Sequence, residues 1–462
     1  MAQTYLFYDL ETTGLNKCFD QVLQFAAIQT TLDFKEIDRY EYHIKLRPDV
    51  IPHPQALLTH RIGIDQLSKG WNEYEATQKI HALFNRPGTI SLGYNSLSFD
   101  DEFLRFAFYR NLLPPYTHQY ANQCYRMDVY PITLLYFLFK NSHLRWPEGN
   151  LKLENICACN DFLHTQAHNA MSDVEATLLL AKRLASSENA WVAATSYFHK
   201  LKDEGRLFDA PAKLMIDHHP YPYGFLVYGK IGMKDNYLAP VLYIGMHAHY
   251  KNQCLFLRLD TGELITETPK GTAKKAWVIK KRLAEPPFFL PFRDNHLSHL
   301  SEARKTLFQE HLNFIGKNPD YFYAIQQRFQ REKYPAVPHQ DIDAALYDIG
   351  FPTAAEEKLF TAFHQTLPEN KLMVAENFSN PIRLEQAKRI MARHYPDYLE
   401  KKELAAFHDA IRSKKIVDYR GEEKLTPALA LQEIQRLEAS MSLDEQQKAL
   451  LESLTSYLTA TA

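Results

Sequence analysis

Residues 5–14 have the sequence YLFYDLETTG, and this stretch decides the fold of the N-terminal part of the chain. Its aromatic and aliphatic residues predict a β-strand that ends around Asp9 and Glu11. Side chains at positions i and i+2 of a strand point to the same face, so these two carboxylates project together. Two carboxylates this close are unfavourable unless a cation neutralises them. Oxygen ligands favour a hard divalent ion over zinc, namely Mg²⁺ with Mn²⁺ as an alternative.

The D-x-E pattern is weak evidence when it is taken alone. A polar strand end in a turn is the ordinary alternative, and Asp100 and Glu102 have the same spacing. Gly14 gives the chain the freedom to turn after the strand. The pattern therefore needs support from the rest of the sequence.

Strand and helix patterns alternate around this stretch. Aromatic and aliphatic residues predict further strands at Val22–Thr30, Tyr40–Leu46 and Thr89–Tyr94. Helical patterns are found at Glu73–Phe84, Asp101–Arg110, Asp128–Asn141, Leu151–Cys159 and Ala170–Ala185. Strands followed by alternating helices and strands indicate an α/β domain with a mixed sheet, which we place at residues 1–186.

The pattern changes after residue 186. Short strand patterns at Tyr223–Tyr228, Val241–Met246 and Cys254–Leu259, the last followed by the hairpin residues Asp260-Thr261-Gly262, predict a small β-barrel over residues 187–340. From residue 341 we expect an all-helical domain over 341–462, with helices at Ala354–Thr366, Pro381–His394, Lys401–Ser413, Pro427–Ser440 and Leu443–Thr459. The pair Thr426-Pro427 and the capping-box spacing of Ser442 and Glu445 predict where the last two helices begin.

The composition excludes several classes of protein. The 462 residues are 45% hydrophobic and 23% charged with a formal net charge of −2, which is typical of a folded chain and not of a disordered one. Five scattered cysteines do not make a disulfide framework. The start MAQTYLFYDL has no signal-peptide pattern, and no apolar run approaches the length of a membrane span. We therefore expect a cytoplasmic protein that does not enter a membrane.

The small net charge conceals a basic middle segment. Residues 185–340 carry 21 basic and 15 acidic side chains, whereas the segments on either side are acidic. A basic domain between acidic ones fits a surface that faces a polyanion. Taken alone, such a run is more often a solvated surface. The densest basic stretch comprises Lys270, Lys274, Lys275, Lys280, Lys281 and Arg282.

Two further polar groups follow predicted elements. Asp100 ends the stretch NSLSFD and opens a helix, from which it can reach the first two carboxylates. Asp101 competes with it for this role, and helix capping is the ordinary alternative. His168 and Asp173 bound the stretch HNAMSD, and they converge only if His168 lies on the loop before a helix. A loop histidine titrates near neutrality and suits a general base, although a chance surface pair is the ordinary alternative.

The ordered set is more specific than its parts. A strand-end D-x-E, then N-x3-F-D at a helix start, then H-x4-D entering a helix together resemble the DEDDh branch of the DnaQ-like 3′–5′ exonucleases, which have a ribonuclease H-like fold. The resemblance implies that Asp9, Glu11, Asp100 and Asp173 hold two Mg²⁺ ions, or Mn²⁺. It also implies that His168 is the general base, and that Glu11, His168 and Asp173 are catalytic.

The resemblance extends to one family within this branch. The stretches FAAI (25–28), GYN (93–95), FDDE (99–102), FYRN (108–111), HNAM (168–171) and DAALY (343–347) are similar to bacterial exonuclease I, the single-strand DNA exodeoxyribonuclease family. The family implies an exonuclease domain, an SH3-like β-barrel and a helical C-terminal domain in one monomer. It also implies two partners, single-stranded DNA and the acidic C-terminal tail of single-stranded DNA-binding protein.

Several residues are candidates for contacts with a nucleic-acid strand. Backbone N–H groups around Thr13 are placed to meet the terminal nucleotide, and Arg105, five residues beyond Asp100, to meet a phosphate. Tyr116 and Tyr120 can stack on bases, although packing is an equal alternative for each. Lys152 stands where the family is expected to have an arginine, so it keeps the charge but lacks the bidentate donors. Lys274 and Lys275 complete the set from the basic middle segment.

The expected reaction is hydrolysis of the 3′-terminal phosphodiester of single-stranded DNA, which releases 5′-mononucleotides in DNA repair and recombination. A 3′–5′ exoribonuclease is one alternative, because the catalytic set does not choose the sugar. A non-catalytic single-strand-binding scaffold is another, and the complete set of carboxylates argues against it.

Overall fold

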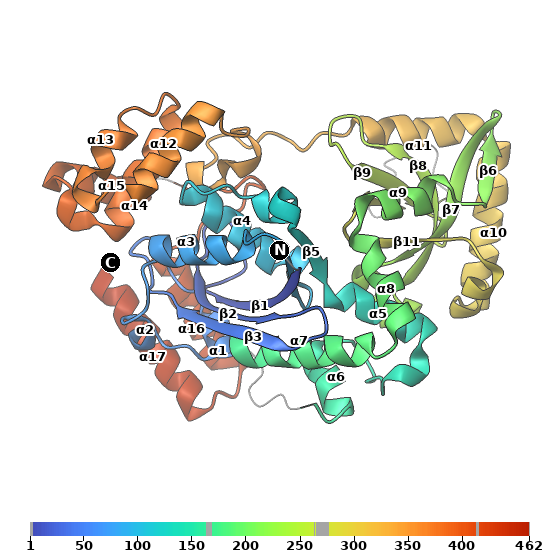
Figure 1. The fold of residues 1–462 in the computed structure, drawn as a ribbon, viewed down its shortest axis with the longest axis horizontal. Coiled ribbons are helices and arrows are strands. Elements are labelled where there is room, and N and C mark those ends of the chain that lie inside the picture. Colours follow the sequence, from blue (N-terminus) through green and yellow to red (C-terminus); the bar gives the residue numbers. More distant parts are fainter. Residues whose placement is uncertain (1–2, 163–168, 263, 265–276, 413–414, 462) are drawn as a thin grey trace. The chain divides into compact units, whose positions relative to one another are not determined.

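The computed structural model describes residues 3–162, 169–262, 264, 277–412 and 415–461 (Figure 1). The chain forms two compact units, and neither is continuous in sequence. The first unit comprises residues 1–126, 164–178 and 336–462, and the second comprises residues 127–163 and 179–335. The three domains expected at 1–186, 187–340 and 341–462 stay a prediction, because each compact unit contains segments from more than one of them.

The predicted mixed sheet is present, and its five strands have the N-terminal strand at the centre. The strands are in the order β3-β2-β1-β4-β5, and β1 pairs antiparallel with β2 and parallel with β4. The strand bounds are β1 (Thr4–Thr12), β2 (Val22–Thr30), β3 (Glu36–His43), β4 (Thr89–Gly93) and β5 (Tyr125–Asp128). β4 pairs with the first half of β1, and β2 pairs with β1 as far as Thr12, so the pairing with β2 holds the end that carries the carboxylates.

Helices complete the N-terminal part of the first unit. They are α1 (Pro54–His60), α2 (Ile64–Leu67), α3 (Glu73–Phe84), α4 (Asp100–Arg110) and the first turns of α7 (Ala170–Ala185). Asn72 caps α3 by accepting a hydrogen bond from the backbone N–H of Glu75 (2.9 Å). The apolar faces of α3 and α4 bury Ile80, Phe84 and Phe103 against Tyr8 and Phe25 of the sheet. This core fixes the start of α4 relative to β1.

The C-terminal part of the first unit is helical, as expected. Its helices are α12 (Ala354–Gln365), α13 (Lys371–Ala375), α14 (Pro381–His394), α15 (Lys401–Arg412), α16 (Pro427–Ser440) and α17 (Glu445–Thr461). Thr426 caps α16 as predicted, with Leu429 N–H donating to its hydroxyl (3.3 Å). The predicted capping box at Ser442 is wrong. Asp444 caps the start of α17 instead, since it exchanges hydrogen bonds with Gln447 (2.9 and 3.1 Å).

Buried contacts join the C-terminal helices to the N-terminal part within this unit. Leu57 and Leu58 of α1 share an apolar cluster with α16 and α17. A buried charge network joins the same two parts of the chain. Asp49 accepts from Arg393 (2.8 Å), Lys424 (3.4 Å) and Arg47 (3.1 Å), and these cations hold its pKa well below the ordinary value despite its burial. Residues some 340 positions apart in sequence therefore share one core.

The second unit contains an antiparallel sheet and flanking helices. The strands follow the path β10-β9-β8-β7-β11, and β6 also pairs with β7. Their bounds are β6 (Lys213–Ile216), β7 (His219–Val227), β8 (Leu238–Met246), β9 (Gln253–Arg258), β10 (Val278–Arg282) and β11 (Phe288–Pro291). The helices are α5 (Val129–Phe139), α6 (Leu153–Cys159), the rest of α7, α8 (Glu188–Thr195), α9 (Lys200–Phe208), α10 (Glu302–Lys317) and α11 (Pro319–Arg331). Within the described residues no pairing of β10 with β11 closes this sheet, so a barrel is not established.

In the part of the chain that the structure describes, no helix combines the length and the apolar character that crossing a membrane requires. The predicted hairpin after β9 borders residues 263 and 265–276, which lie outside the described residues.

Candidate active site

Three of the predicted carboxylates meet at the end of β1. Asp9 and Glu11 lie on one face of the strand, and Asp173 comes from the first turn of α7. Each offers a carboxylate oxygen, and these oxygens all lie within 4.8 Å of one another. The i, i+2 spacing thus places the first two side chains together as the sequence indicates, and the fold brings in the third from more than 160 residues away.

Asp100 is the fourth carboxylate of this site. It is the first residue of α4 and is 5% exposed. Its negative charge is one cause of the raised pKa of both Asp9 and Glu11, so it lies close enough to act on them. Asp101 points elsewhere and is fully buried against Arg105 (2.8 Å), Arg126 (2.6 Å) and His118 (3.0 Å). Of the two candidates left open by the sequence, Asp100 therefore faces the cluster.

The electrostatics of the cluster favour a bound cation. Burial raises the pKa of Asp9 well above its ordinary value, and the charges of Asp100, Asp173 and Glu11 raise it further. Burial, then Asp173 and Asp100, raise the pKa of Glu11 to about 9. Carboxylates placed like this repel one another, and a divalent cation with oxygen ligands removes that repulsion. The donor set therefore fits Mg²⁺ or Mn²⁺, while the described contacts do not distinguish between the two.

Arg105 forms a buried ion pair in the structure, and its expected contact with a phosphate stays a prediction. Its side chain is 3% exposed, and both Nε (3.1 Å) and Nη2 (2.8 Å) donate to Asp101. Burial raises the pKa of the Asp101 carboxyl, but the charges of Arg126 and Arg105 and the hydrogen bond from His118 outweigh this effect and hold the pKa well below the ordinary value. An aspartate and an arginine four residues apart on a helix form an ion pair, and here that local pair takes the arginine inward. Arg105 therefore supports the start of α4.

Thr13 is paired with other residues of the first unit, and its expected contact with the terminal nucleotide stays a prediction. Thr13 is 0% exposed, and its hydroxyl donates to Asp20 (2.9 Å) and accepts from the N–H of Gln21 (2.9 Å). Its backbone N–H donates to the carbonyl of Gln21 (2.9 Å), and its carbonyl accepts from His53 (2.7 Å). The hydroxyl, the N–H and the carbonyl of Thr13 are therefore all paired inside the protein.

The other predicted nucleic-acid contacts differ in how exposed their side chains are. Tyr120 is 69% exposed, whereas Tyr116 is half-buried against an apolar cluster of the first unit. Lys152 precedes α6 in the second unit, with its side chain 68% exposed and 3.6 Å from Glu154. Lys281 is buried and paired with Asp203 (2.6 Å), so this part of the basic stretch is structural. His168, Lys270, Lys274 and Lys275 lie outside the described residues.

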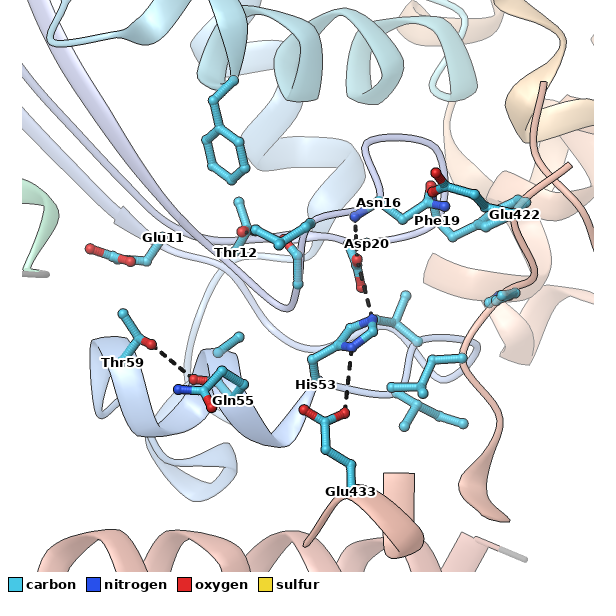
Figure 2. A pocket seen from close by; sticks show the side chains of 18 of the residues that line it. Glu11, Thr12, Asn16, Phe19, Asp20, His53, Gln55, Thr59, Glu422 and Glu433 are labelled. Carbon is cyan, nitrogen blue, oxygen red and sulfur yellow. Dashed lines mark hydrogen bonds and ion pairs between the residues drawn. The ribbon is translucent and has the colours of Figure 1, made fainter. Parts of the chain in front are cut away.

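A cavity of about 810 Å³ adjoins the carboxylates within the first unit. Glu11 and Thr12 line one end, and Lys424 and Glu433 of the C-terminal part line another. Figure 2 shows the His53 ring between the carboxylates of Asp20 (Nε2 to Oδ2, 3.6 Å) and Glu433 (Nδ1 to Oε2, 3.9 Å). Sequence reasoning missed this cavity, because its walls meet only through the packing of α1 against α16. The other residues with a charged side chain in its lining are Arg420, Glu422 and Glu423.

Gly14 allows His53 and Asp20 to approach the strand end. A Cβ at this position would lie 2.2 Å from His53 Cδ2 and 2.5 Å from Asp20 Oδ2, which no side chain tolerates without movement. Its φ is not in the left-handed region. The residue is thus required for space, and the sequence argument that it supplies freedom to turn gave the wrong reason.

Two family models match this chain. The model described as Exonuclease matches residues 6–181, and the model described as Exonuclease I C-terminal domain matches residues 340–461. Exodeoxyribonuclease I of Escherichia coli (strain K12) is 27% identical over an alignment that covers 98% of this chain and 97% of that protein. The chain belongs to the exonuclease I family. The resemblance drawn from the sequence is confirmed.

Other members of the exonuclease I family support the assignment. Exodeoxyribonuclease I of Haemophilus influenzae is 25% identical over 80% of this chain and 79% of its own length. The crystal structure of E. coli exonuclease I in complex with a dA16 oligonucleotide covers 100% of both chains with a TM-score of 0.87 at 24% identity. A structure titled SSB/Exonuclease I in complex with inhibitor CFAM also covers 100% of both, with a TM-score of 0.84 at 23% identity. The exonuclease I fold therefore extends over the whole chain.

Proposed function

We propose that this chain is a 3′–5′ exodeoxyribonuclease that degrades single-stranded DNA to 5′-mononucleotides and serves DNA repair and recombination. The observation that carries the proposal is the convergence of Asp9, Glu11 and Asp173 within 4.8 Å, beside Asp100, in a chain similar to exodeoxyribonuclease I over 98% of its length. Clustered carboxylates with raised pKa values beside a cavity are typical of a functional site.

Asp9, Glu11, Asp100 and Asp173 would hold two divalent ions, Mg²⁺ with Mn²⁺ as the alternative. Bound there, such ions lower the pKa of a coordinated water and stabilise the charge on the leaving oxygen. The chain itself holds its carboxylates in place before the substrate arrives, because β1 and the start of α4 are packed into the core.

His168 would take the proton from the attacking water. The new bond joins the water oxygen to the terminal phosphorus, and the bond from that phosphorus to the 3′ oxygen of the preceding nucleotide breaks. The released nucleotide keeps its 5′-phosphate, and the shortened strand ends in a new 3′-hydroxyl. The cavity beside Glu11 would receive the terminal nucleoside, since the carboxylates of Asp20 and Glu433 make its far end unsuitable for a phosphate.

Several finer assignments belong to the same proposal. The antiparallel sheet of the second unit would be an SH3-like barrel, and the first unit a ribonuclease H-like domain joined to the helical C-terminal part. Lys152, Lys274 and Lys275 would contact the DNA backbone, and Tyr120 would stack on a base. The acidic C-terminal tail of single-stranded DNA-binding protein would be a partner, since a solved relative is titled as a complex with SSB. We propose a cytoplasmic monomer.

The experiment measures the shortening of a 5′-labelled single-stranded DNA oligonucleotide and of an RNA oligonucleotide of the same sequence. Each is incubated with the protein once in the presence of Mg²⁺ and once in the presence of a chelator. Rapid shortening of DNA from the 3′ end, abolished by the chelator, is the expected result. Preferential shortening of RNA would support the exoribonuclease alternative. Binding of DNA without metal-dependent cleavage of either strand would support the scaffold alternative and contradict the proposal.

A further inference from the structure

Lys17, in the loop that follows β1, contacts the start of α4 on both sides of Asp100. Its Nζ donates to the backbone carbonyl of Ser98 (2.7 Å) and forms an ion pair with the carboxylate of Glu102. Ser98 lies two residues before Asp100, and Glu102 lies two residues after it. The side chains of Lys17 and Glu102 are 17% and 25% exposed, so the pair is mostly shielded from water. Lys17 therefore holds the short segment that contains Asp100.

The loop that carries Lys17 is itself held by hydrogen bonds. The backbone N–H of Asn16 donates to the carboxylate of Asp20 (2.8 Å; Figure 2). The side-chain oxygen of Asn16 accepts from the backbone N–H groups of Cys18 (3.0 Å) and Phe19 (3.3 Å). Cys18 and Phe19 are buried on either side of these bonds. The Lys17 side chain therefore reaches α4 from a fixed backbone position.

The first turn of α4 has no capping side chain of its own. Phe99 is the N-cap residue, and its side chain forms no capping hydrogen bond. Asp101 ties this turn to Arg126 of β5. Lys17 ties the same turn to the loop that continues from Glu11. It thus connects the segment that carries the first two carboxylates of the cluster with the segment that carries the next one.

Lys17 does not belong to the walls of the large cavity. Leu15 and Phe19 of the same loop line the cavity beside Glu11, whereas Lys17 does not. Both described contacts of its amine are made to the start of α4. This position fits a residue that orients other groups, and not one that binds the nucleotide.

We propose that Lys17 is a positioning residue that keeps Asp100 at the distance from Asp9 and Glu11 at which the cluster binds divalent cations. The inference rests on the proposed function, because these carboxylates are the metal ligands proposed there. Groups that orient metal ligands from behind contribute about ten- to a hundredfold to metal affinity. One flexible side chain with two contacts belongs at the lower end of this range, about tenfold.

The charge of Lys17 and its contacts predict opposite effects on metal affinity. Lys17→Met removes a positive charge near a cation site, and this change alone would strengthen the binding of a cation. The same substitution releases the start of α4, and the loss of orientation weakens binding. The direction of the change in affinity therefore distinguishes positioning from a simple effect of charge.

The test is Mn²⁺ binding to the chain without DNA, followed by the electron paramagnetic resonance signal of the free ion. Asp173→Asn removes one carboxylate of the cluster and so identifies which ions are bound there. Lys17→Met should weaken Mn²⁺ binding at the cluster by about tenfold. Lys17→Arg keeps a cation with several N–H donors, so its loss should stay below about threefold. An unchanged or higher affinity in Lys17→Met, or equal losses in the two variants, overturns the inference.

Lys448→Met is the matched control. Lys448 pairs with Glu445 (2.8 Å) in the same unit, but the two side chains are 53% and 92% exposed. This variant should bind Mn²⁺ like the unaltered chain, and the melting temperature of every variant shows whether it is folded. If Lys17→Met does not fold, Lys17→Gln replaces it. Lys17→Gln loses the ion pair and should bind Mn²⁺ about threefold less tightly, and an unaltered affinity overturns the inference.

Cleavage of single-stranded DNA gives a second readout. At saturating Mg²⁺ the KM of Lys17→Met should be unaltered, because Lys17 does not line the cavity. A raised KM with an unaltered Mn²⁺ affinity would make Lys17 a substrate contact and overturn the inference.

The inference and the proposed function fail independently. Cleavage of labelled single-stranded DNA by the unaltered chain with Mg²⁺ tests the function. Cleavage by that chain, together with an unaltered Mn²⁺ affinity in Lys17→Met, rejects the positioning role alone, whereas no cleavage rejects the function itself.

Discussion

Arg393→Met should strongly destabilise the first unit, because Arg393 joins its N-terminal and C-terminal parts through buried charges. The guanidinium donates to Asp49 (2.8 Å) and also to Asp343, and the side chains of Arg393, Asp49 and Asp343 are 2%, 0% and 5% exposed. Methionine fills much of the same volume without the charge. The substitution therefore leaves two buried carboxylates with fewer cations.

The loss of unfolding free energy depends on the cationic partners that each carboxylate retains. Removing one partner of a buried pair costs about 3–5 kcal/mol, because the other charge is left uncompensated. Asp49 retains Arg47 (3.1 Å) and Lys424 (3.4 Å), and Asp343 retains Arg389 (3.2 Å). The free energy of unfolding should thus fall by the lower end of that range, about 3 kcal/mol.

The assay is denaturation by guanidinium chloride, followed by tryptophan fluorescence at neutral pH. Arg61→Met is the matched control, since Arg61 also pairs with the C-terminal part, at Asp444 (2.7 Å), but with side chains 44% and 47% exposed. An exposed pair contributes about 0–1 kcal/mol, so this variant should stay close to the unaltered chain. Equal effects of the two substitutions, or a loss below about 1 kcal/mol for Arg393→Met, would refute the reasoning.

Three further predictions concern stability and the site. Acid should weaken the charge network, because the pKa of Asp49 is lowered in the folded state. The stabilisation from Asp49 is complete above the pKa of about 3.9 in the unfolded chain and is lost progressively as the pH falls below that value. The measurement is the melting temperature as a function of pH, and a melting temperature that stays constant in acid would contradict this prediction. Gly14→Ala should raise the KM for single-stranded DNA, since its Cβ would displace His53. Gly262→Ala should leave the KM unchanged, because no atom of the described residues would lie within 4 Å of its Cβ, and equal KM values of the two variants would contradict the spatial argument. Lys281→Met should lower the free energy of unfolding by about 3–5 kcal/mol, because it leaves the charge of Asp203 unpaired in the interior. Denaturation measures this loss, and an unaltered midpoint would contradict a buried ion pair.

The sequence predicts those parts of the site that depend on local geometry. The alternation of side chains along β1 is enough to place Asp9 and Glu11 on one face. The resemblance to a family adds Asp173, which no local pattern connects to β1. The choice between Asp100 and Asp101 was open because both stand in the first turn of α4. The structure decides it through buried partners of Asp101 that come from outside this helix.

The contacts that the sequence did not indicate also have physical causes. Arg105 forms an ion pair with Asp101, four residues earlier on α4, which the sequence pattern alone did not indicate. Thr13 was expected to offer its backbone, but the loop folds back so that Gln21 and His53 use its N–H and carbonyl. The cavity walls near Lys424 and Glu433 depend on packing between segments some 370 residues apart, which no sequence periodicity encodes.

The most direct test of the account compares Asp173→Asn with Glu175→Gln in the cleavage of single-stranded DNA with Mg²⁺. Both residues lie on α7 and each substitution removes one negative charge, but Asp173 belongs to the carboxylate cluster while Glu175 is 44% exposed and pairs with Arg39. The account predicts that Asp173→Asn loses cleavage by at least about a hundredfold, the scale of one preorganised electrostatic group, while it still binds DNA. Glu175→Gln should cleave like the unaltered chain. Undiminished cleavage by Asp173→Asn would contradict the claim that these carboxylates form the active site.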